Sequence, residues 1–415
     1  MRWFFAGGHA ALLMLLPAVG LTMGAAAADK QYGPGVTDTE IKIGNMMPYS
    51  GPLRYVGIVN GKAVAAYFAM INHHGGVNGR RTIDFISRDD AYSPPKTIEM
   101  AHQLVEQDHV LLLFFPAGTA SNIAIRDYMN EKMVPQLFVI SGASQLNDPK
   151  HYPWTMGFQP SYRVEARVYA RHILKNVPNA KIAVLYQNDD FGRDYLIGLR
   201  EGLGDKAERM IIATQTYETT DAMVDSQIAA LQRSGADVLL TAALGKFAVQ
   251  TIDKVYDSGW RPTHFLTTLS SELTGVIHPA GPEKAVGIIS AAFNKDPANP
   301  QWQDAPEYKE YAAWMKKYNP SGNIADGGYV YSYIAAQLMV YVLEQCGDKL
   351  TRENVMKQAA NIHDLQLPLL LPGITISTSP TDFAPIKQMQ LMRFNGARWV
   401  GFGEVISGAG KPVSE

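Results

Sequence analysis

The sequence predicts an α/β protein built from two doubly wound lobes, each with a parallel sheet that is covered by helices on both faces. Segments with strand and helix patterns alternate along most of the chain, which is typical of βα units and parallel sheets. The chain has 415 residues, which is more than one hydrophobic core usually organises. Two domains are therefore expected.

The first lobe begins with a short apolar strand at 41–44 and a helix at 61–71 whose apolar residues recur at helical spacing. The alternation of polar and apolar residues at 82–86 predicts a second strand. Pro94 begins a helix, a position where its missing N–H is tolerated. The further elements expected up to residue 140 are the rest of that helix to 107, a buried strand at 111–115, a helix at 121–131 and a strand at 136–140.

The same alternation starts again after residue 160, which predicts a second sheet of the same kind. The expected helices are 163–175, 191–203, 223–235, 247–258, 307–318, 328–343 and 351–360. The expected strands are 181–186, 210–216, 238–241, 264–267, 286–292, 373–376 and 389–394.

The N-terminus has the composition of a cleaved export signal. Arg2 supplies a positive charge, residues 10–21 are apolar, and Ala26-Ala27-Ala28 forms a small-residue cleavage site. The apolar run is too short for a membrane anchor and is interrupted by Pro17. We therefore expect residues 1–28 to be a signal peptide, cleaved near Ala28, and the mature protein to be periplasmic.

The composition excludes several classes of function. A formal net charge of −2 gives no reason to expect a nucleic acid or an anionic membrane as partner. Cys346 is the single cysteine, so no internal disulfide forms, and its apolar helical surroundings indicate a buried, unreactive thiol. The chain carries no G-x-S-x-G, H-E-x-x-H, Walker or C-x-x-C motif. We expect no enzyme activity, no metal and no cofactor.

Loops that follow the predicted strands are the candidate ligand site, because open parallel sheets bind ligands beyond the carboxyl ends of their strands. Two such loops, 116–121 and 141–144, are rich in small residues and open onto helices. Exposed backbone N–H groups at a helix N-terminus favour an anion, so these loops could bind a carboxylate. Ordinary capping of the two helices explains the same residues.

An ordered set of motifs resembles the leucine/isoleucine/valine-binding protein family, the type I periplasmic solute-binding proteins of ATP-driven (ABC) importers. The motifs are Ile41-Lys42-Ile43-Gly44, Ser50-Gly51-Pro52, 71–79 (INHHGGVNG), Arg88-Asp89-Asp90, 186–192 (YQNDDFG), Leu371-Pro372-Gly373-Ile374 and Met392-Arg393-Phe394. The resemblance is collinear over about residues 38–400.

The resemblance implies three hinge crossings between the lobes, near 154–156, 291–293 and 371–375. Lobe one would comprise 38–156 plus 292–368, and lobe two 157–291 plus 369–410. It also implies that a monomer captures a small organic solute between closing lobes and delivers it to the membrane permease of an ABC importer.

Carried over residue by residue, the resemblance places the ligand carboxylate on the two small-residue loops. The implied ligand-binding residues of lobe one are Arg54, Tyr55, Gly118, Thr119, Ser141, Gly142 and Ser144. Those of lobe two are Asp190, Phe191, Leu244 and Leu269.

Leu244 and Leu269 depart from the family pattern, because amino-acid binders keep a polar aromatic residue and an acid at these positions for the ligand's ammonium group. An ammonium group buried without a counter-charge is costly. Either another acid, such as Glu272 or Asp190, takes this role, or the ligand has no ammonium group. We expect an aromatic or branched organic acid first, and a branched-chain or other hydrophobic amino acid next. A ligand-sensing receptor of the same fold is the alternative function.

Overall fold

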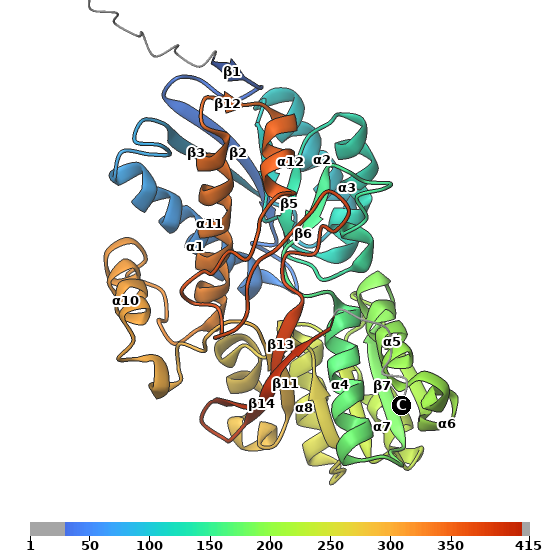
Figure 1. The fold of residues 1–415 in the computed structure, drawn as a ribbon. Coiled ribbons are helices and arrows are strands. Elements are labelled where there is room, and N and C mark those ends of the chain that lie inside the picture. The colour runs from blue at the N-terminus through green and yellow to red at the C-terminus, as the bar shows by residue number, and fades with distance from the viewer. Residues whose placement is uncertain (1–29, 409–415) are drawn as a thin grey trace, which may run out of the picture.

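The computed structural model describes residues 30–408 and contains two large sheets, one in each half of the molecule, and one small two-stranded sheet (Figure 1). The predicted signal peptide lies outside the described residues. Lobe one, as used below, is the part built on the five-stranded sheet, and lobe two is the part built on the seven-stranded sheet. The predicted α/β class and doubly wound parallel arrangement are confirmed.

The sheet of lobe one has the strand order β3-β2-β4-β5-β6, and all its pairs are parallel. Its strands are β2 (Glu40–Met47), β3 (Thr82–Asp89), β4 (Leu112–Phe114), β5 (Gln136–Val139) and β6 (Thr155–Gly157). The associated helices are α1 (Arg54–His73), α2 (Pro94–His102), α3 (Thr119–Glu131), α10 (Pro306–Tyr318), α11 (Gly327–Cys346) and α12 (Arg352–Ala359). Strands β4 and β5 are fully buried, as their continuous apolar runs predict.

The sheet of lobe two has the order β14-β13-β11-β10-β9-β7-β8. Its strands are β7 (Ile182–Gln187), β8 (Ile211–Tyr217), β9 (Val238–Ala242), β10 (Thr263–Leu266), β11 (Ile289–Ala292), β13 (Gln388–Phe394) and β14 (Trp399–Ser407). Strand β13 pairs antiparallel with both β11 and β14 at one edge, and the other pairs are parallel. The helices are α4 (Tyr162–Asn176), α5 (Asp190–Leu203), α6 (Ala207–Met210), α7 (Asp225–Arg233), α8 (Lys246–Asp257) and α9 (His278–Ala280).

Four expected elements differ from the structure; the first is the helix expected at 61–71, which runs from Arg54 to His73 as α1. Residues 373–376 form no strand, because Gly373 turns the backbone at φ +84° and only an isolated bridge joins Leu365 and Ile376. The strand expected from 286 begins at Ile289, after Gly287 at φ +91°. The helix expected to run to 107 ends at His102 and continues as a π-helix.

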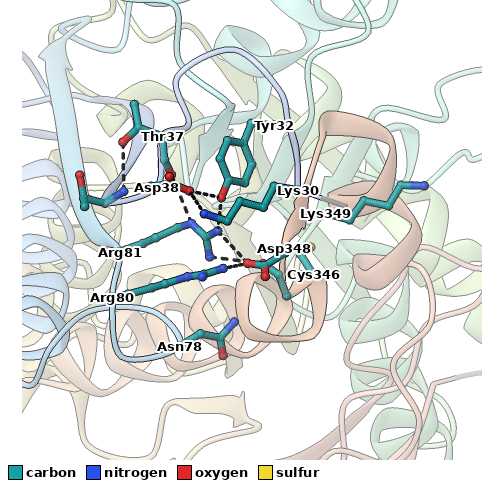
Figure 2. Close-up of polar contacts among 12 residues, drawn as sticks. Lys30, Tyr32, Thr37, Asp38, Asn78, Arg80, Arg81, Cys346, Asp348 and Lys349 are labelled. Atoms are coloured by element: carbon teal, nitrogen blue, oxygen red, sulfur yellow. Dashed lines mark hydrogen bonds and ion pairs between the residues drawn. The ribbon is translucent and has the colours of Figure 1, made fainter. Parts of the chain in front are cut away.

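A buried arginine joins the first described residues to the end of α11 (Figure 2). The Arg81 side chain is fully buried and donates to the Tyr32 hydroxyl at 2.8 Å and to Asp348 Oδ1 at 2.9 Å. Its Nε donates to the carbonyl of Thr37 at 3.3 Å. Strand β1 (Gln31–Tyr32) pairs with β12 (Lys349–Leu350) beside this cluster. These contacts anchor the start of the folded domain on lobe one.

Cys346 at the end of α11 is buried, and burial raises the pKa of its thiol to about 12. The thiol is therefore protonated and unreactive at neutral pH, as the sequence predicts.

Candidate functional site

A cavity of about 160 Å³ lies between the two lobes and is lined by residues of both. Lobe one contributes Tyr55, Tyr92, Gly118 and Thr119, among others. Lobe two contributes Leu244, Leu269 and Glu272. Its position beyond the carboxyl ends of parallel strands is the usual place for a ligand in this class of sheet.

One end of the cavity is the N-terminus of α3. Gly118, the residue before the helix, has φ +98°, and a Cβ there would lie 2.6 Å from the Tyr92 ring. Glycine therefore allows both the left-handed backbone and the close approach of the aromatic ring. The first-turn N–H groups of a helix lack partners within the helix, and the helix dipole is positive at this end. This end of the cavity therefore favours an anionic group.

Hydroxyl groups surround the same end. The Thr119 hydroxyl is hydrogen-bonded to the Ser141 hydroxyl at 2.7 Å, and the Tyr162 hydroxyl lies 3.4 Å from both. Burial raises the pKa of Tyr162 to about 12, so this phenol remains a proton donor at neutral pH. Ser141 Oγ also accepts the N–H of Ala143 at 3.1 Å, which fixes its position. The cluster can reorient its hydroxyl hydrogens toward a carboxylate.

Leu244 and Leu269 are apolar residues of lobe two that line the cavity. Leu244 follows β9, and its N–H donates to the Tyr217 hydroxyl at 3.1 Å. Leu269 lies in the short 3-10 helix Thr268–Ser270 after β10. Both side chains are half-buried, and neither offers a hydrogen-bonding group to a ligand.

The other residues implied by the family resemblance do not line the cavity. Ser144 is turned to lobe two, where its N–H and hydroxyl donate to Asp194 at 2.6 and 3.1 Å. Gly142 lies against the Tyr162 ring, which a Cβ would approach to 2.8 Å. Ser141 reaches the site only through the hydroxyl of Thr119.

Arg54 is exposed at the start of α1, outside the cavity lining. Phe191 is fully buried and packs edge-on against Tyr162, with 5.0 Å between the ring centroids. Asp190 lies 3.5 Å from the exposed Arg193 side chain. Phe191 therefore supports the site from behind, whereas Arg54 and Asp190 face solvent.

Several lining residues were not selected from the sequence. Tyr92 has a left-handed backbone, φ +58°, and its hydroxyl receives a 3.4 Å hydrogen bond from Gln187 of lobe two. Tyr331 on α11 donates to Gln159 Oε1 at 2.7 Å. Its helix is apolar all round, so nothing in the sequence pattern separates Tyr331 from ordinary core residues.

Two acidic side chains, Glu272 and Asp296, are among the described residues that line the cavity. Burial raises the pKa of the Glu272 carboxyl to about 7. Within residues 30–408 its carboxylate has no hydrogen-bond or ion-pair partner. Asp296 also lines the cavity; burial raises its pKa to about 6, but its Oδ1 accepts the N–H of Ala298 at 2.9 Å.

The lobes touch each other around the cavity. A Cβ on Gly275 of lobe two would lie 2.6 Å from the Tyr55 ring of lobe one, and one on Gly245 would lie 3.0 Å from the carbonyl oxygen of Pro52. Asn323 donates to the hydroxyl of Thr274 at 3.3 Å. The two lobes are therefore in contact at several points around the cavity.

Comparisons with known proteins identify the class. Residues 40–398 match the model of the periplasmic binding protein family, so the chain belongs to this family. The family is one of solute-binding proteins and not of enzymes. Members of the family are periplasmic. In the described range no helix has the length and apolar character needed to cross a membrane, and no group of side chains there could hold a metal ion.

Individual relatives are distant. The Leu/Ile/Val-binding protein homolog 7 of Brucella abortus is 22% identical over 356 residues, which cover 81% of this chain and 84% of the relative. A branched-chain amino acid ABC transporter protein from Thermus thermophilus, solved with bound valine, has a TM-score of 0.79 and 18% identity, covering 90% of this chain and 98% of that one. A solute-binding protein of an ABC transporter from R. palustris, in complex with 4-hydroxybenzoate, has a TM-score of 0.73 and 17% identity, covering 89% and 97%. These likenesses establish the fold.

Proposed function

We propose that this protein captures a small carboxylate-bearing solute with an aromatic or branched apolar body and delivers it to the permease of an ABC importer. The observation that carries the proposal is the cavity between the lobes, whose lining combines the anion-favouring Gly118 and Thr119 of lobe one with the apolar Leu244 and Leu269 of lobe two. Valine and 4-hydroxybenzoate, the ligands of the two structural relatives, both combine a carboxylate with an apolar body.

In this proposal fewer residues contact the solute than the sequence suggested. Gly118, Thr119 and the hydroxyl cluster behind them bind the carboxylate, and Tyr55, Leu244 and Leu269 contact the body of the solute. Ser144 and Phe191 do not contact the solute in this proposal, because Ser144 is hydrogen-bonded to Asp194 and Phe191 packs against Tyr162.

The proposal includes closure by hinge motion of a monomer in the periplasm, after removal of residues 1–28. The crossings are proposed near 154–156, 291–293 and 371–375, which divide the chain into 38–156 plus 292–368 and 157–291 plus 369–410. Contacts between the lobes, such as that of Tyr55 with Gly275, would separate and re-form as the hinge opens and closes.

Native mass spectrometry of the protein, purified gently from the periplasm of a producing cell, tests the proposal. We expect a retained small molecule whose released form carries a carboxyl group. Recovery of a solute without any acidic group would contradict the assigned carboxylate end. Loss of the solute in a Thr119 variant, but not in wild type, would place it in this cavity.

A further inference from the structure

Three amide side chains line the cavity, and they differ in how their nitrogen atoms are used. Asn60 and Asn294 each donate from Nδ2 to a backbone carbonyl, at 2.8 and 3.3 Å. Gln159 lines the same cavity and is only 2% exposed, but within residues 30–408 no protein group accepts from its Nε2. A buried N–H group without a partner is costly, so this amide is suited to donate to a bound solute.

Tyr331 sets the orientation of the Gln159 amide. Its hydroxyl donates to Gln159 Oε1 at 2.7 Å, and burial holds the pKa of this phenol well above its usual value, so it remains a donor at neutral pH. The Tyr331 ring packs against Phe115 and Phe158, with 5.3 and 5.2 Å between the ring centroids. Because Tyr331 occupies the oxygen side of the amide, the two N–H groups are presented on the other side.

The backbone of Gln159 is held on both sides. Residues 158–161 connect β6 of lobe one with α4 of lobe two. Before Gln159, the fully buried Phe158 donates its N–H to the carbonyl of Val139 at 3.1 Å. After it, Ser161 caps α4 by accepting the N–H of Val164 at 3.2 Å. The amide therefore projects from a fixed segment and not from a loose loop.

The Gln159 amide lies near the end of the cavity that favours an anion. Tyr162, three residues further along, has its hydroxyl 3.4 Å from those of Thr119 and Ser141. Tyr162 is also close enough to Tyr331 that the charge of its ionised form raises the pKa of Tyr331. A donor beside this hydroxyl cluster meets the part of the solute next to its carboxylate.

We infer that Gln159 Nε2 donates to an oxygen atom that the solute carries beside its carboxylate, and that Gln159 thereby selects 2-oxo acids over acids with a methylene group at that position. This inference rests on the proposed function and deepens it by naming the class of acid. A methylene group leaves the N–H groups of Gln159 without an acceptor, whereas a carbonyl oxygen accepts one of them.

Matched pairs of acids test the inference on the full mature chain. The probes are phenylpyruvate beside 3-phenylpropanoate, and 4-methyl-2-oxopentanoate beside 4-methylpentanoate. Calorimetry at neutral pH measures the four affinities, and the readout is the ratio of Kd values within each pair. A general loss of stability does not change this ratio, because both members of a pair bind the same folded protein.

Two variants remove the N–H donors in different ways. Gln159→Glu keeps the length of the side chain and an oxygen that accepts from Tyr331. Gln159→Met combined with Tyr331→Phe removes the amide and also the hydroxyl that would lose its acceptor. Gln107→Met, at an exposed position of lobe one, is the matched control. Thermal unfolding shows that each variant is folded.

We expect wild type and Gln107→Met to bind the 2-oxo member of at least one pair more than about tenfold more tightly, because a site with a buried donor rejects the analogue that lacks the acceptor. In both Gln159 variants the preference should fall below about threefold. Equal binding of the two members by wild type overturns the inference. So does a preference that survives in both variants, or the absence of binding by all four acids.

The outcomes separate this inference from the proposed function. Thr119→Val should weaken both members of a pair and leave their ratio unchanged, because the carboxylate is common to both. If wild type binds both members equally well, the assignment of Gln159 fails and carboxylate capture stands. If the solute retained in native mass spectrometry has no carboxyl group, the proposed function itself fails.

Discussion

Two substitutions, Thr119→Val and Ser144→Ala, test whether the two small-residue loops have the same role, as their similar sequences suggest. Thr119 lines the cavity and its hydroxyl belongs to the cluster with Ser141 and Tyr162. The Ser144 hydroxyl instead donates to Asp194, outside the cavity. The structure therefore predicts different effects for two changes that each remove one hydroxyl.

Valine has nearly the shape of threonine, so Thr119→Val removes a donor without opening a void. A hydrogen bond to a charged group contributes about 1.5–3 kcal/mol, and a charged acceptor left short of one costs about 1–3 kcal/mol. We expect Thr119→Val to weaken solute binding by about 1–3 kcal/mol, which is about 5- to 150-fold in Kd.

Ser144→Ala keeps the backbone N–H that donates to Asp194 at 2.6 Å, and Arg163 Nε still donates to the same carboxylate at 2.8 Å. We expect a loss of stability of about 1 kcal/mol, typical of one hydrogen bond, and a change in binding below about 0.5 kcal/mol.

Calorimetry with the solute identified by mass spectrometry measures both affinities, and denaturant unfolding measures both stabilities. Equal weakening of binding by the two substitutions would refute the placement of Ser144, because it would mean that the solute reaches the second loop. Wild-type affinity in Thr119→Val would move the carboxylate away from α3.

Three further predictions concern the pH dependence, the anchor at the N-terminus and the hinge. Burial lowers the pKa of His264 to about 4, so below pH 6.5 this histidine binds a proton in the unfolded chain but not in the folded chain. The free energy of unfolding should therefore drop by about 2 kcal/mol between pH 7 and pH 5. In His264→Gln the free energy of unfolding should depend less on pH over this range. Arg81→Met removes a buried partner of Asp348 and of the Tyr32 hydroxyl, although Arg80 still pairs with Asp348, and should lower the denaturation midpoint by an amount equivalent to about 1–3 kcal/mol, whereas Arg54→Met at an exposed site should not. Small-angle scattering should give a smaller radius of gyration with bound solute than without it, and an unchanged radius would argue against hinge closure.

The sequence by itself determined the α/β class and most of the helices and strands. Apolar periodicity and the residues at element ends are local signals, and they survive in the folded protein wherever packing agrees with them. The helix expected at 307–318 is α10, Pro306–Tyr318, and the strand expected at 389–394 is β13, Gln388–Phe394. The signal fails at 373–376, where an apolar segment of strand-like composition follows a left-handed glycine and has no neighbour to form a ladder.

The direction of each side chain at the site was decided only by the tertiary structure. The two small-residue loops look alike in sequence, but Ser144 is hydrogen-bonded to Asp194, fifty residues further along the chain, and does not line the cavity. Glu272 lies in a stretch of serine, threonine and leucine that shows no pattern of its own. Its pKa is raised by packing against segments distant in the chain, and the Tyr55 ring, more than two hundred residues earlier, lies against the nearby Gly275. Such contacts join segments that are distant in the chain, and burial and charge compensation arise from those contacts, so a local pattern of residues does not contain them.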